Sequence, residues 1–361
     1  MSEQPRPSSL RILQITDATT WRGGERQLLY LAEGLVEQGH QVAVACPRHS
    51  VVAQRFQAEG IPVIPLALRG GPLRALPDFL RAVRRFRPHL LAAQTSGAHT
   101  LALLASGLYP LPPLVVHRRR PSQAARLRGW KYRHPRVRRY LAISRFIAQS
   151  LEAIGVPRSR IAVVPSALRF PLPPVPSPGT LGLRQYPWTV GTVAAFTGEK
   201  NLTFWLEVMA LVLRQRPEGA GVLVGEGRLE PLLRQWAQRL GIADRIHILR
   251  YQPGIAGLFT VFLSTSRIEG LGTALMEALA YGVPVVAPQV GGIPEVVRPQ
   301  QTGFLVDTWQ AEAFAQRVLQ LLQDPHLRHR MGTAARQDIR TRFSVGSMVQ
   351  RTLEVYQEVL L

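Results

Sequence analysis

The chain has 361 residues, 46% of them hydrophobic, and its 44 lysines and arginines outnumber 23 aspartates and glutamates, which gives a net charge of +21. This length predicts two or three domains, and the hydrophobic fraction suffices for two sizeable cores, which excludes a mainly disordered chain. No apolar run reaches the ~18 residues of a membrane-spanning helix, no secretory signal is expected, and one cysteine, Cys46, is too few for a disulfide framework or a cysteine-based zinc cluster. We therefore expect a cytoplasmic protein.

Short apolar strands and amphipathic helices alternate along the first half of the chain. Apolar residues recur at helical spacing, for example at Leu28, Leu31 and Leu35. Strands are expected at residues 10–15, 41–46, 62–66, 90–93, 114–117, 140–143 and 161–164. Helices are expected at residues 25–38, 51–59, 72–86, 98–107 and 145–154. Such alternation with short loops predicts a parallel sheet that helices cover on both faces.

A proline-rich segment, residues 171–187, separates this series from a second one and is interpreted as an interdomain linker. The second series has expected strands at residues 189–194, 221–224, 245–249, 260–263, 283–287 and 304–306, and helices at 201–214, 229–240, 273–281 and 310–322. The prediction is an α/β protein with two Rossmann-like domains, residues 1–170 and 188–344, and a last helix at about 345–361 that packs back on the first domain. The carboxyl ends of both parallel sheets would face a central cleft that holds the ligand.

Basic residues are concentrated in the first half. Between residues 48 and 145 the only acidic residues are Glu59 and Asp78. The basic stretch, residues 118–139, has no acid, and its cations are Arg118, Arg119, Arg120, Arg126, Arg128, Lys131, Arg133, Arg136, Arg138 and Arg139. Because Trp130 and Tyr132 lie among them, an anionic membrane surface is the favoured partner. A solvated basic face is the alternative, and nucleic acid is a less favoured partner.

A glycine-rich turn follows the strand expected at residues 260–263. Glu269 stands at its entrance, a helix is expected to begin near Thr273, and Glu277 lies about one helical turn further on. Backbone N–H groups at such a turn and helix N-terminus form an anion site. The two carboxylates are suited to accept hydrogen bonds from sugar hydroxyls; the alternative is an ordinary helix with one acid before it and one on its exposed face.

This segment, with its continuation AYGVPVVAPQVGGIPEVV, resembles the signature of the family 4 retaining glycosyltransferases and their Glu-x7-Glu motif. WRGGERQLLYLAEGLVEQGHQVAVACP, AISRFIAQSLEAIGVPRSRIAVVPSA and VGTVAAFTGEKNLTFWLEV resemble further blocks of the family in the same order. The resemblance implies a GT-B fold, a nucleotide-diphosphate sugar as donor, retention of anomeric configuration, and neither metal nor cofactor. It further implies transfer of a hexose to a hydroxyl of a glycan or lipid-linked acceptor in cell-envelope or polysaccharide biosynthesis, in the cytoplasm or on the inner face of the cell membrane.

The same resemblance assigns the donor-binding residues. Glu277 would bind the ribose hydroxyls, and Lys200 would neutralise the pyrophosphate. Glu269 would contact the donor sugar. The backbone groups implied to lie near the sugar and the diphosphate are those of Gly23, Gly24, Gly270, Leu271, Gly272 and Thr273.

His117 matches the family histidine beside the reacting sugar, so Glu269, His117 and Lys200 are the expected catalytic residues. His99 is a weaker candidate for the same cleft. In the family's mechanism the acceptor attacks from the face that the diphosphate leaves, and the leaving phosphate takes the acceptor's proton.

One departure concerns the phosphate site. Relatives usually carry an arginine five positions before the lysine, where this chain has Ala195. Arg22 or Arg118 could replace that cation. The alternative is a non-catalytic sugar-nucleotide or membrane-binding protein on the same fold. An NAD dehydrogenase is disfavoured because no Gly-x-Gly-x-x-Gly follows the first strand, and the Glu-x7-Glu context favours transfer over epimerisation.

Overall fold

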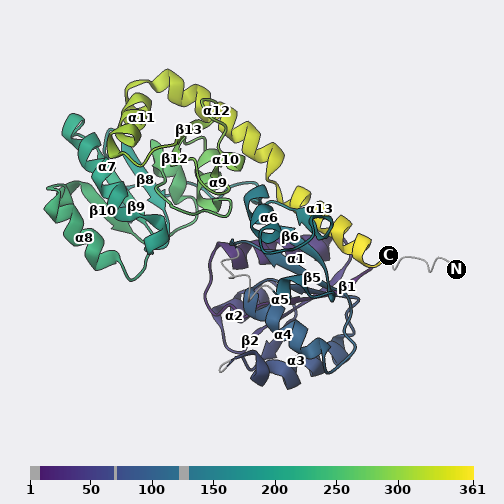
Figure 1. Cartoon of the computed structure of the whole chain (residues 1–361). Helices are drawn as coiled ribbons and strands as arrows, with labels where there is room; N and C mark the ends of the chain where they lie inside the picture. Colours follow the sequence, from purple (N-terminus) through teal and green to yellow (C-terminus); the bar gives the residue numbers. More distant parts are fainter. Residues whose placement is uncertain (1–8, 69–70, 122–129) are drawn as a thin grey trace. The chain divides into compact units, whose positions relative to one another are not determined.

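The computed structural model describes residues 9–68, 71–121 and 130–361, and the chain divides into two compact units (Figure 1). The first unit runs to Ala167 and also includes Val345–Leu361, and the second unit is Leu168–Ser344. The proline-rich segment expected as a linker therefore belongs to the second unit. Its Pro173 carbonyl accepts a hydrogen bond from the Tyr281 hydroxyl (2.6 Å).

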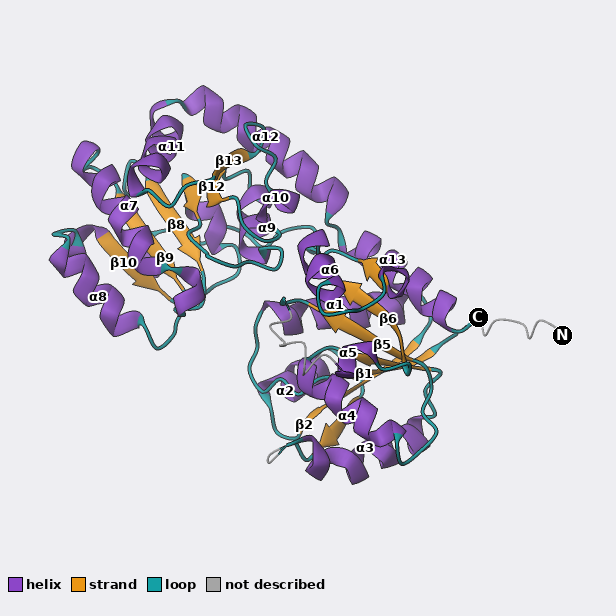
Figure 2. Ribbon diagram, viewed as in Figure 1, coloured by secondary structure: helices purple, strands orange, loops and turns teal. Residues whose placement is uncertain are grey.

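The first unit is built on a seven-stranded parallel sheet of order β3-β2-β1-β4-β5-β6-β7 (Figure 2). Its strands are β1 (Arg11–Ile15), β2 (Gln41–Pro47), β3 (Val63–Leu66), β4 (Leu90–Ala93), β5 (Leu114–Arg118), β6 (Val137–Ala142) and β7 (Ile161–Val163). Its helices are α1 (Gly23–Glu37), α2 (Val51–Ala58), α3 (Pro72–Phe86), α4 (Ser96–Ser106), α5 (Trp130–Arg133), α6 (Arg145–Glu152) and α13 (Val345–Val359). Side chains of successive strand residues point to opposite faces. One face packs against α1, α2 and α13, and the other against α3, α4 and α6.

The second unit has a six-stranded parallel sheet of order β10-β9-β8-β11-β12-β13. Its strands are β8 (Thr189–Val193), β9 (Ala220–Val224), β10 (Ile246–Leu249), β11 (Val261–Leu263), β12 (Val285–Pro288) and β13 (Gly303–Val306). Its helices are α7 (Leu202–Gln215), α8 (Glu230–Arg239), α9 (Thr273–Ala280), α10 (Ile293–Val296), α11 (Ala311–Gln323) and α12 (Pro325–Arg342). Trp205, Met209 and Phe314 lie fully buried in its core.

The strand order reverses once in each sheet, between β1 and β4 in the first unit and between β8 and β11 in the second. Loops leave the carboxyl ends of the two central strands in opposite directions at such a point and open a crevice there. The topology thus marks the residues that follow β1, β4, β8 and β11 as candidate ligand contacts.

The expected doubly wound α/β fold is confirmed, and each expected strand has a counterpart in the structure. The helix α12 was not expected. Its core-facing residues include Gly332 and Ala335, and a Cβ on Gly332 would lie 2.3 Å from the Gly282 carbonyl oxygen. The helix also buries Leu327, Met331 and Ile339, but three large apolar side chains in 18 residues form a sparse stripe that is easily missed. Among the described residues no helix combines the length and apolarity needed to cross a membrane.

Candidate active site

Lys200 and Glu269 meet at the reversal point of the second sheet. Lys200 ends a single 3₁₀ turn after β8, and Glu269 lies in the loop after β11. The lysine Nζ donates to the carboxylate Oε2 at 2.6 Å, and the two side chains are 19% and 18% exposed. A partly shielded pair of this kind is stronger than a surface ion pair and fixes both groups in position.

Backbone contacts join the Lys200 turn to the loop after β11. The Thr265 hydroxyl lies 3.1 Å from the carbonyl oxygens of both Lys200 and Asn201, and the Arg267 amide donates to the Glu199 carbonyl (2.8 Å). Asn201 begins α7 in the left-handed conformation (φ 52°), which asparagine tolerates better than most residues. The ammonium is therefore held by rigid structure on both sides.

The loop that carries Glu269 rests on two glycines of the loop after β12. The Gly292 amide donates to the Glu269 carbonyl (2.9 Å). A Cβ on Gly291 would lie 2.2 Å from that same carbonyl oxygen, and one on Gly292 would lie 2.2 Å from the Gly270 oxygen. Sequence reasoning did not name Gly291 or Gly292 as site residues, although the Gly-Gly pair was visible.

α9 begins directly after this loop. Gly272 precedes it with φ +94°, and it has no side chain that could cap the helix. The amides of the first turn, starting at Thr273, are therefore available to an anion, which the helix dipole also favours. Leu271 is buried and anchors the turn. The backbone groups of Gly270, Leu271, Gly272 and Thr273 thus lie together at the start of α9.

Glu277 lies one turn into α9 and faces a tyrosine that sequence reasoning missed. The Tyr251 hydroxyl is 3.5 Å from Glu277 Oε2, and Tyr251 is exposed just after the carboxyl end of β10. Burial, assisted by Glu277 and Tyr251, raises the pKa of the neighbouring Tyr281 to about 12. Glu277 therefore has phenolic neighbours, and its carboxylate can accept hydrogen bonds from hydroxyl groups.

Ala195 follows β8, and a basic residue stands in the adjacent loop. The Phe196 amide donates to the Glu226 carbonyl (2.9 Å), and a Cβ on Gly227 would lie 2.6 Å from the Phe196 oxygen. The loop after β9 is thereby pressed onto the Ala195 segment. The next residue, Arg228, is exposed, and its side chain forms no ion pair or hydrogen bond with the described residues.

In the first unit, Gly23 and Gly24 begin α1, and exposed Arg22 caps it. The Arg22 amide donates to the Glu25 carboxylate (3.0 Å). A Cβ on Gly24 would lie 3.5 Å from Cδ of Arg119, so the start of α1 and Arg119 are in contact distance.

His117 lies in β5 and is only 7% exposed. A hydrogen bond of 2.8 Å joins its Nε2 to the Tyr356 hydroxyl of α13. Burial, and then the charge of Arg119, lower its pKa well below the usual value, so the ring is neutral. Arg119 donates to Gln94 Oε1 (2.7 Å), and burial lowers the Arg119 pKa to about 10. These residues form one polar network.

The structure corrects the prediction for His99 and shows that Arg118 is engaged. His99 is completely buried in α4, edge-on to the rings of Tyr132 and Tyr140, and therefore faces no cleft. Arg118 is also buried, and its guanidinium lies 5.3 Å from the centre of the Tyr132 ring. Of the two suggested replacement cations only Arg22 is exposed.

Further polar groups at the reversal point of the first sheet were missed by sequence reasoning. The Asp17 amide donates to Thr95 Oγ1 (3.3 Å), and a Cβ on Gly97 would lie 1.8 Å from Asp17 Oδ2. Lys131 donates to Ser96 Oγ (2.7 Å). Burial lowers the Lys131 pKa, and the carboxylate of Asp17 acts in the opposite direction.

The basic stretch does not form one uniform surface. Arg126 and Arg128 lie outside the described residues. Arg139 donates to the Ser159 carbonyl (2.6 Å) and pairs with Glu358. The exposed cations among its described members are Arg120, Arg133, Arg136 and Arg138.

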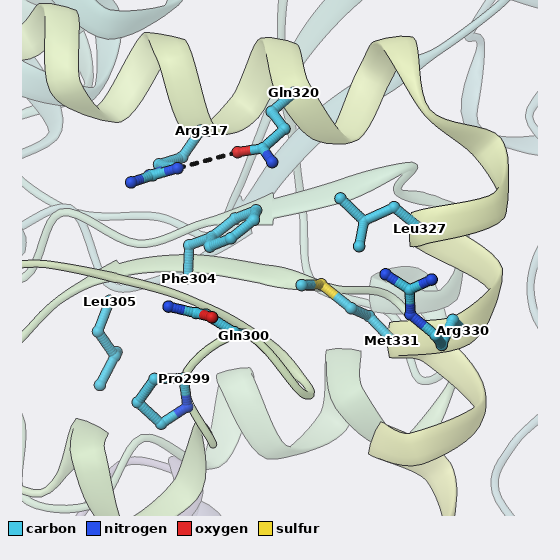
Figure 3. A pocket seen from close by; sticks show the side chains of 9 residues that line it. All are labelled: Pro299, Gln300, Phe304, Leu305, Arg317, Gln320, Leu327, Arg330 and Met331. Atoms are coloured by element: carbon cyan, nitrogen blue, oxygen red, sulfur yellow. Dashed lines mark hydrogen bonds between the residues drawn. The ribbon is translucent and has the colours of Figure 1, made fainter.

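No group of three or more His, Cys, Asp or Glu side chains suited to a metal occurs among the described residues. A cavity of about 370 Å³ lies between α11, α12 and the start of β13. Figure 3 shows Arg317 and Arg330 at its rim above Phe304 and Met331. It contains none of the predicted site residues, because they follow the carboxyl ends of the strands whereas Phe304 lies near the amino end of β13.

Two family models match the chain. The model described as glycosyl transferases group 1 matches residues 178–338, and the model described as glycosyltransferase family 4 matches residues 21–168. The chain belongs to the family 4 glycosyltransferases.

This glycosyltransferase is similar to N-acetyl-alpha-D-glucosaminyl L-malate synthase of Bacillus anthracis, with 34% identity over 142 residues, which are 38% of this chain and 37% of that protein. It is also similar to the putative colanic acid biosynthesis glycosyltransferase WcaL of Escherichia coli, with 32% identity, 49% of this chain and 46% of that protein. The alignments thus span less than half of these curated relatives.

Solved structures show that this glycosyltransferase has the GT-B fold. Anabaena HepE in complex with UDP-glucose superposes with a TM-score of 0.85 at 20% identity, covering 97% of this chain and 100% of that one. WaaG, a glycosyltransferase involved in lipopolysaccharide biosynthesis, gives a TM-score of 0.71 at 14% identity, covering 95% and 99%. The predicted family and fold are therefore confirmed.

Proposed function

We propose that this glycosyltransferase moves a hexose from a nucleotide-diphosphate sugar to a hydroxyl of a glycan or lipid-linked acceptor, with retention of anomeric configuration. The observation that carries the proposal is the Lys200–Glu269 pair beside the uncapped N-terminus of α9. It combines a positive charge, free backbone donors and a carboxylate at the reversal point of a parallel sheet. A diphosphate with a sugar attached needs each of these groups.

Breaking the bond between sugar and phosphate develops negative charge on the diphosphate. In our proposal the Lys200 ammonium and the first amides of α9 stabilise that charge. Glu269 accepts hydrogen bonds from the donor sugar, and the Gly270–Gly272 backbone lies near it. The leaving phosphate takes the acceptor's proton. Since lysine and helix amides supply the positive charge, the mechanism uses no metal and no cofactor.

Glu277 and Tyr251 form the nucleotide end of the proposed site. A carboxylate can accept both ribose hydroxyls at once. The exposed Tyr251 ring offers a face on which a base can stack, and its hydroxyl lies close enough to hold Glu277 in place. HepE was solved with UDP and with UDP-glucose, so UDP is the first nucleotide to test.

Arg228 is our preferred replacement for the arginine that relatives have at the position of Ala195. The loop after β9 packs on the Ala195–Phe196 backbone, and Arg228 belongs to the same unit as Lys200. Arg22 is the second choice. Arg118 is disfavoured because it is buried over Tyr132.

The acceptor side of the proposal rests on the first unit. Asp17, held against Gly97 at the reversal point, can accept a hydrogen bond from an acceptor hydroxyl. His117, a neutral ring hydrogen-bonded to Tyr356, is the residue that the family pattern assigns beside the reacting sugar. The exposed Arg133, Arg136 and Arg138 would meet an anionic membrane surface, placing the enzyme in the cytoplasm at the inner face of the cell membrane in cell-envelope or polysaccharide biosynthesis.

Calorimetric titration with UDP, GDP and ADP, followed by a nucleotide-release assay with the matching sugar nucleotides, tests the proposal. We expect binding of one nucleotide and slow release from its sugar, unchanged by EDTA and strongly reduced in Lys200→Ala. Binding without turnover for every donor and acceptor would favour the non-catalytic alternative. No binding of any nucleotide would refute the donor site itself.

A further inference from the structure

α3 has an exposed face with an unusual composition. Successive residues of an α-helix turn by about 100°, so its outward residues fall within an arc of about 120°. These residues are Leu73, Arg74, Pro77, Arg81, Arg84 and Arg85. The opposite side packs into the core through Ala75, Phe79, Ala82 and Val83.

The charge of this face is positive along its whole length. Asp78 is the one acid of α3; it is half-buried at the edge of the arc, where it accepts from the Ala67 amide (3.0 Å) and pairs with Arg81 (2.8 Å). The helix dipole explains arginines in the last turn, but it disfavours Arg74 in the first turn. Helix stability alone therefore does not account for the arrangement.

Exposed leucines stand at both ends of the face. Leu73 begins it and is 67% exposed. Leu108, after α4, is also 67% exposed, and its neighbour Tyr109 lies under the Arg84 guanidinium at 4.9 Å. α3 and α4 pack side by side in the first unit (Figure 1). Arginines with flanking leucines can pair with phosphate headgroups while the leucines enter the acyl boundary.

We propose that the outward face of α3 docks flat on an anionic lipid bilayer. This deepens the proposed function, because it rests on an acceptor-side unit that works at a membrane and names the surface that touches it. Nucleic acid fits less well, since leucine does not stack on bases and no aromatic ring lies within the arc. An anionic bilayer matches both the positive charge and the apolar ends.

Co-sedimentation with vesicles of phosphatidylcholine and phosphatidylserine tests this surface, with pure phosphatidylcholine vesicles as reference. The variant Arg74→Gln, Arg81→Gln, Arg85→Gln leaves the Arg84–Tyr109 contact intact. At roughly fivefold per cation, its partitioning should fall about a hundredfold. The control Arg214→Gln, Arg239→Gln, Arg330→Gln removes the same charge from exposed positions on α7, α8 and α12 and should bind nearly as the parent does. Leu73→Ser should weaken binding that remains in high salt.

Two results would overturn the inference: an α3 variant that binds like the parent, or a control variant that loses as much. A parent that prefers single-stranded oligonucleotide over vesicles at equal phosphate concentration would overturn it as well. A further triple variant, Arg133→Gln, Arg136→Gln, Arg138→Gln, separates this inference from the membrane contact in the proposed function. Calorimetry with UDP on the three triple variants reports on the donor site independently, since the substitutions lie outside it.

Discussion

Replacing Gly291 by alanine should disable the proposed donor site by displacing the loop that carries Glu269. The new Cβ would lie 2.2 Å from the Glu269 carbonyl oxygen, and real Cβ atoms do not approach closer than 3.0 Å. The loop must then retreat by roughly 0.8 Å, because the opposing atoms are backbone and cannot rotate away. Alanine at φ +58° also costs about 1–2 kcal/mol of stability in the left-handed region.

The retreat would carry Glu269 away from Lys200 and strain the hydrogen bond from the Gly292 amide (2.9 Å). A displacement of this size can reduce turnover about a hundredfold, which corresponds to about 2.7 kcal/mol of transition-state stabilisation. We therefore expect kcat/KM for the donor to fall about a hundredfold, with a native circular dichroism spectrum at 25 °C.

The assay is nucleotide release from the preferred sugar nucleotide, with thermal unfolding measured in parallel. Gly179→Ala is the matched control, since it adds the same methyl group where nothing lies within 4 Å. It should retain the parent's rate. If Gly291→Ala kept full activity while still folded, the contact of Gly291 with the Glu269 backbone would not position Glu269, and the reasoning would fail.

Two further substitutions test the charges of the site. Lys200→Ala should lower kcat by about a hundredfold or more through lost stabilisation of the leaving diphosphate, and Lys200→Arg should restore only part of it, because a guanidinium is larger and planar; equal rates in Lys200→Arg and the parent would mean that any cation suffices. Glu277→Ala should weaken UDP binding by about 1.5–3 kcal/mol through lost charged hydrogen bonds to ribose, and calorimetry that finds unchanged affinity would remove Glu277 from the ribose site.

The fold could be predicted from sequence because its signals are local. Buried parallel strands are short apolar runs, and the helices between them show one apolar stripe. The expected helix at residues 72–86 coincides with α3 (Pro72–Phe86). α12 was missed because its apolar stripe is sparse: in 18 residues it buries three large apolar side chains, Leu327, Met331 and Ile339, beside the small Gly332 and Ala335. Apolar periodicity therefore detects a broad stripe more readily than a sparse one such as that of α12.

The site could be predicted only in part. Lys200 and Glu269 are 69 residues apart, and only the family resemblance assigned them to one site before the structure joined them. The contact of Gly291 with the Glu269 backbone and the approach of Tyr251 to Glu277 depend on which loops meet in space, and no local sequence pattern encodes that. For His117 the sequence pattern was visible but its surroundings were not. A histidine at a strand end matched the family pattern, yet its ring is hydrogen-bonded to Tyr356 of the last helix.

The burial of His99 was likewise not visible in the sequence. It makes the free energy of unfolding depend on pH in a way that can be measured. Burial, and then the charges of Lys131 and Arg118, lower its pKa to about 3. The folded protein therefore keeps His99 neutral while the unfolded chain takes up a proton below its ordinary pKa of about 6.5, so stability is lost as pH falls from 6.5 toward 3. This one group should cost about 2 kcal/mol between pH 8 and pH 5. His117 acts in the same direction.

His99→Phe keeps a ring of similar size against Tyr132 and Tyr140. The variant should match the parent's free energy of unfolding at pH 8 to within the cost of repacking and lose about 2 kcal/mol less than the parent on going to pH 5. Urea unfolding at pH 8 and pH 5 gives the change in unfolding free energy for each protein. Comparing the change in the variant with that in the parent cancels the contribution of repacking, which is the same at both pH values. Exposed His329→Asn is the control and should follow the parent at both pH values. Equal losses in His99→Phe and the parent would show that His99 is protonated in the folded protein, which would require an acidic partner or water in the core of the first unit.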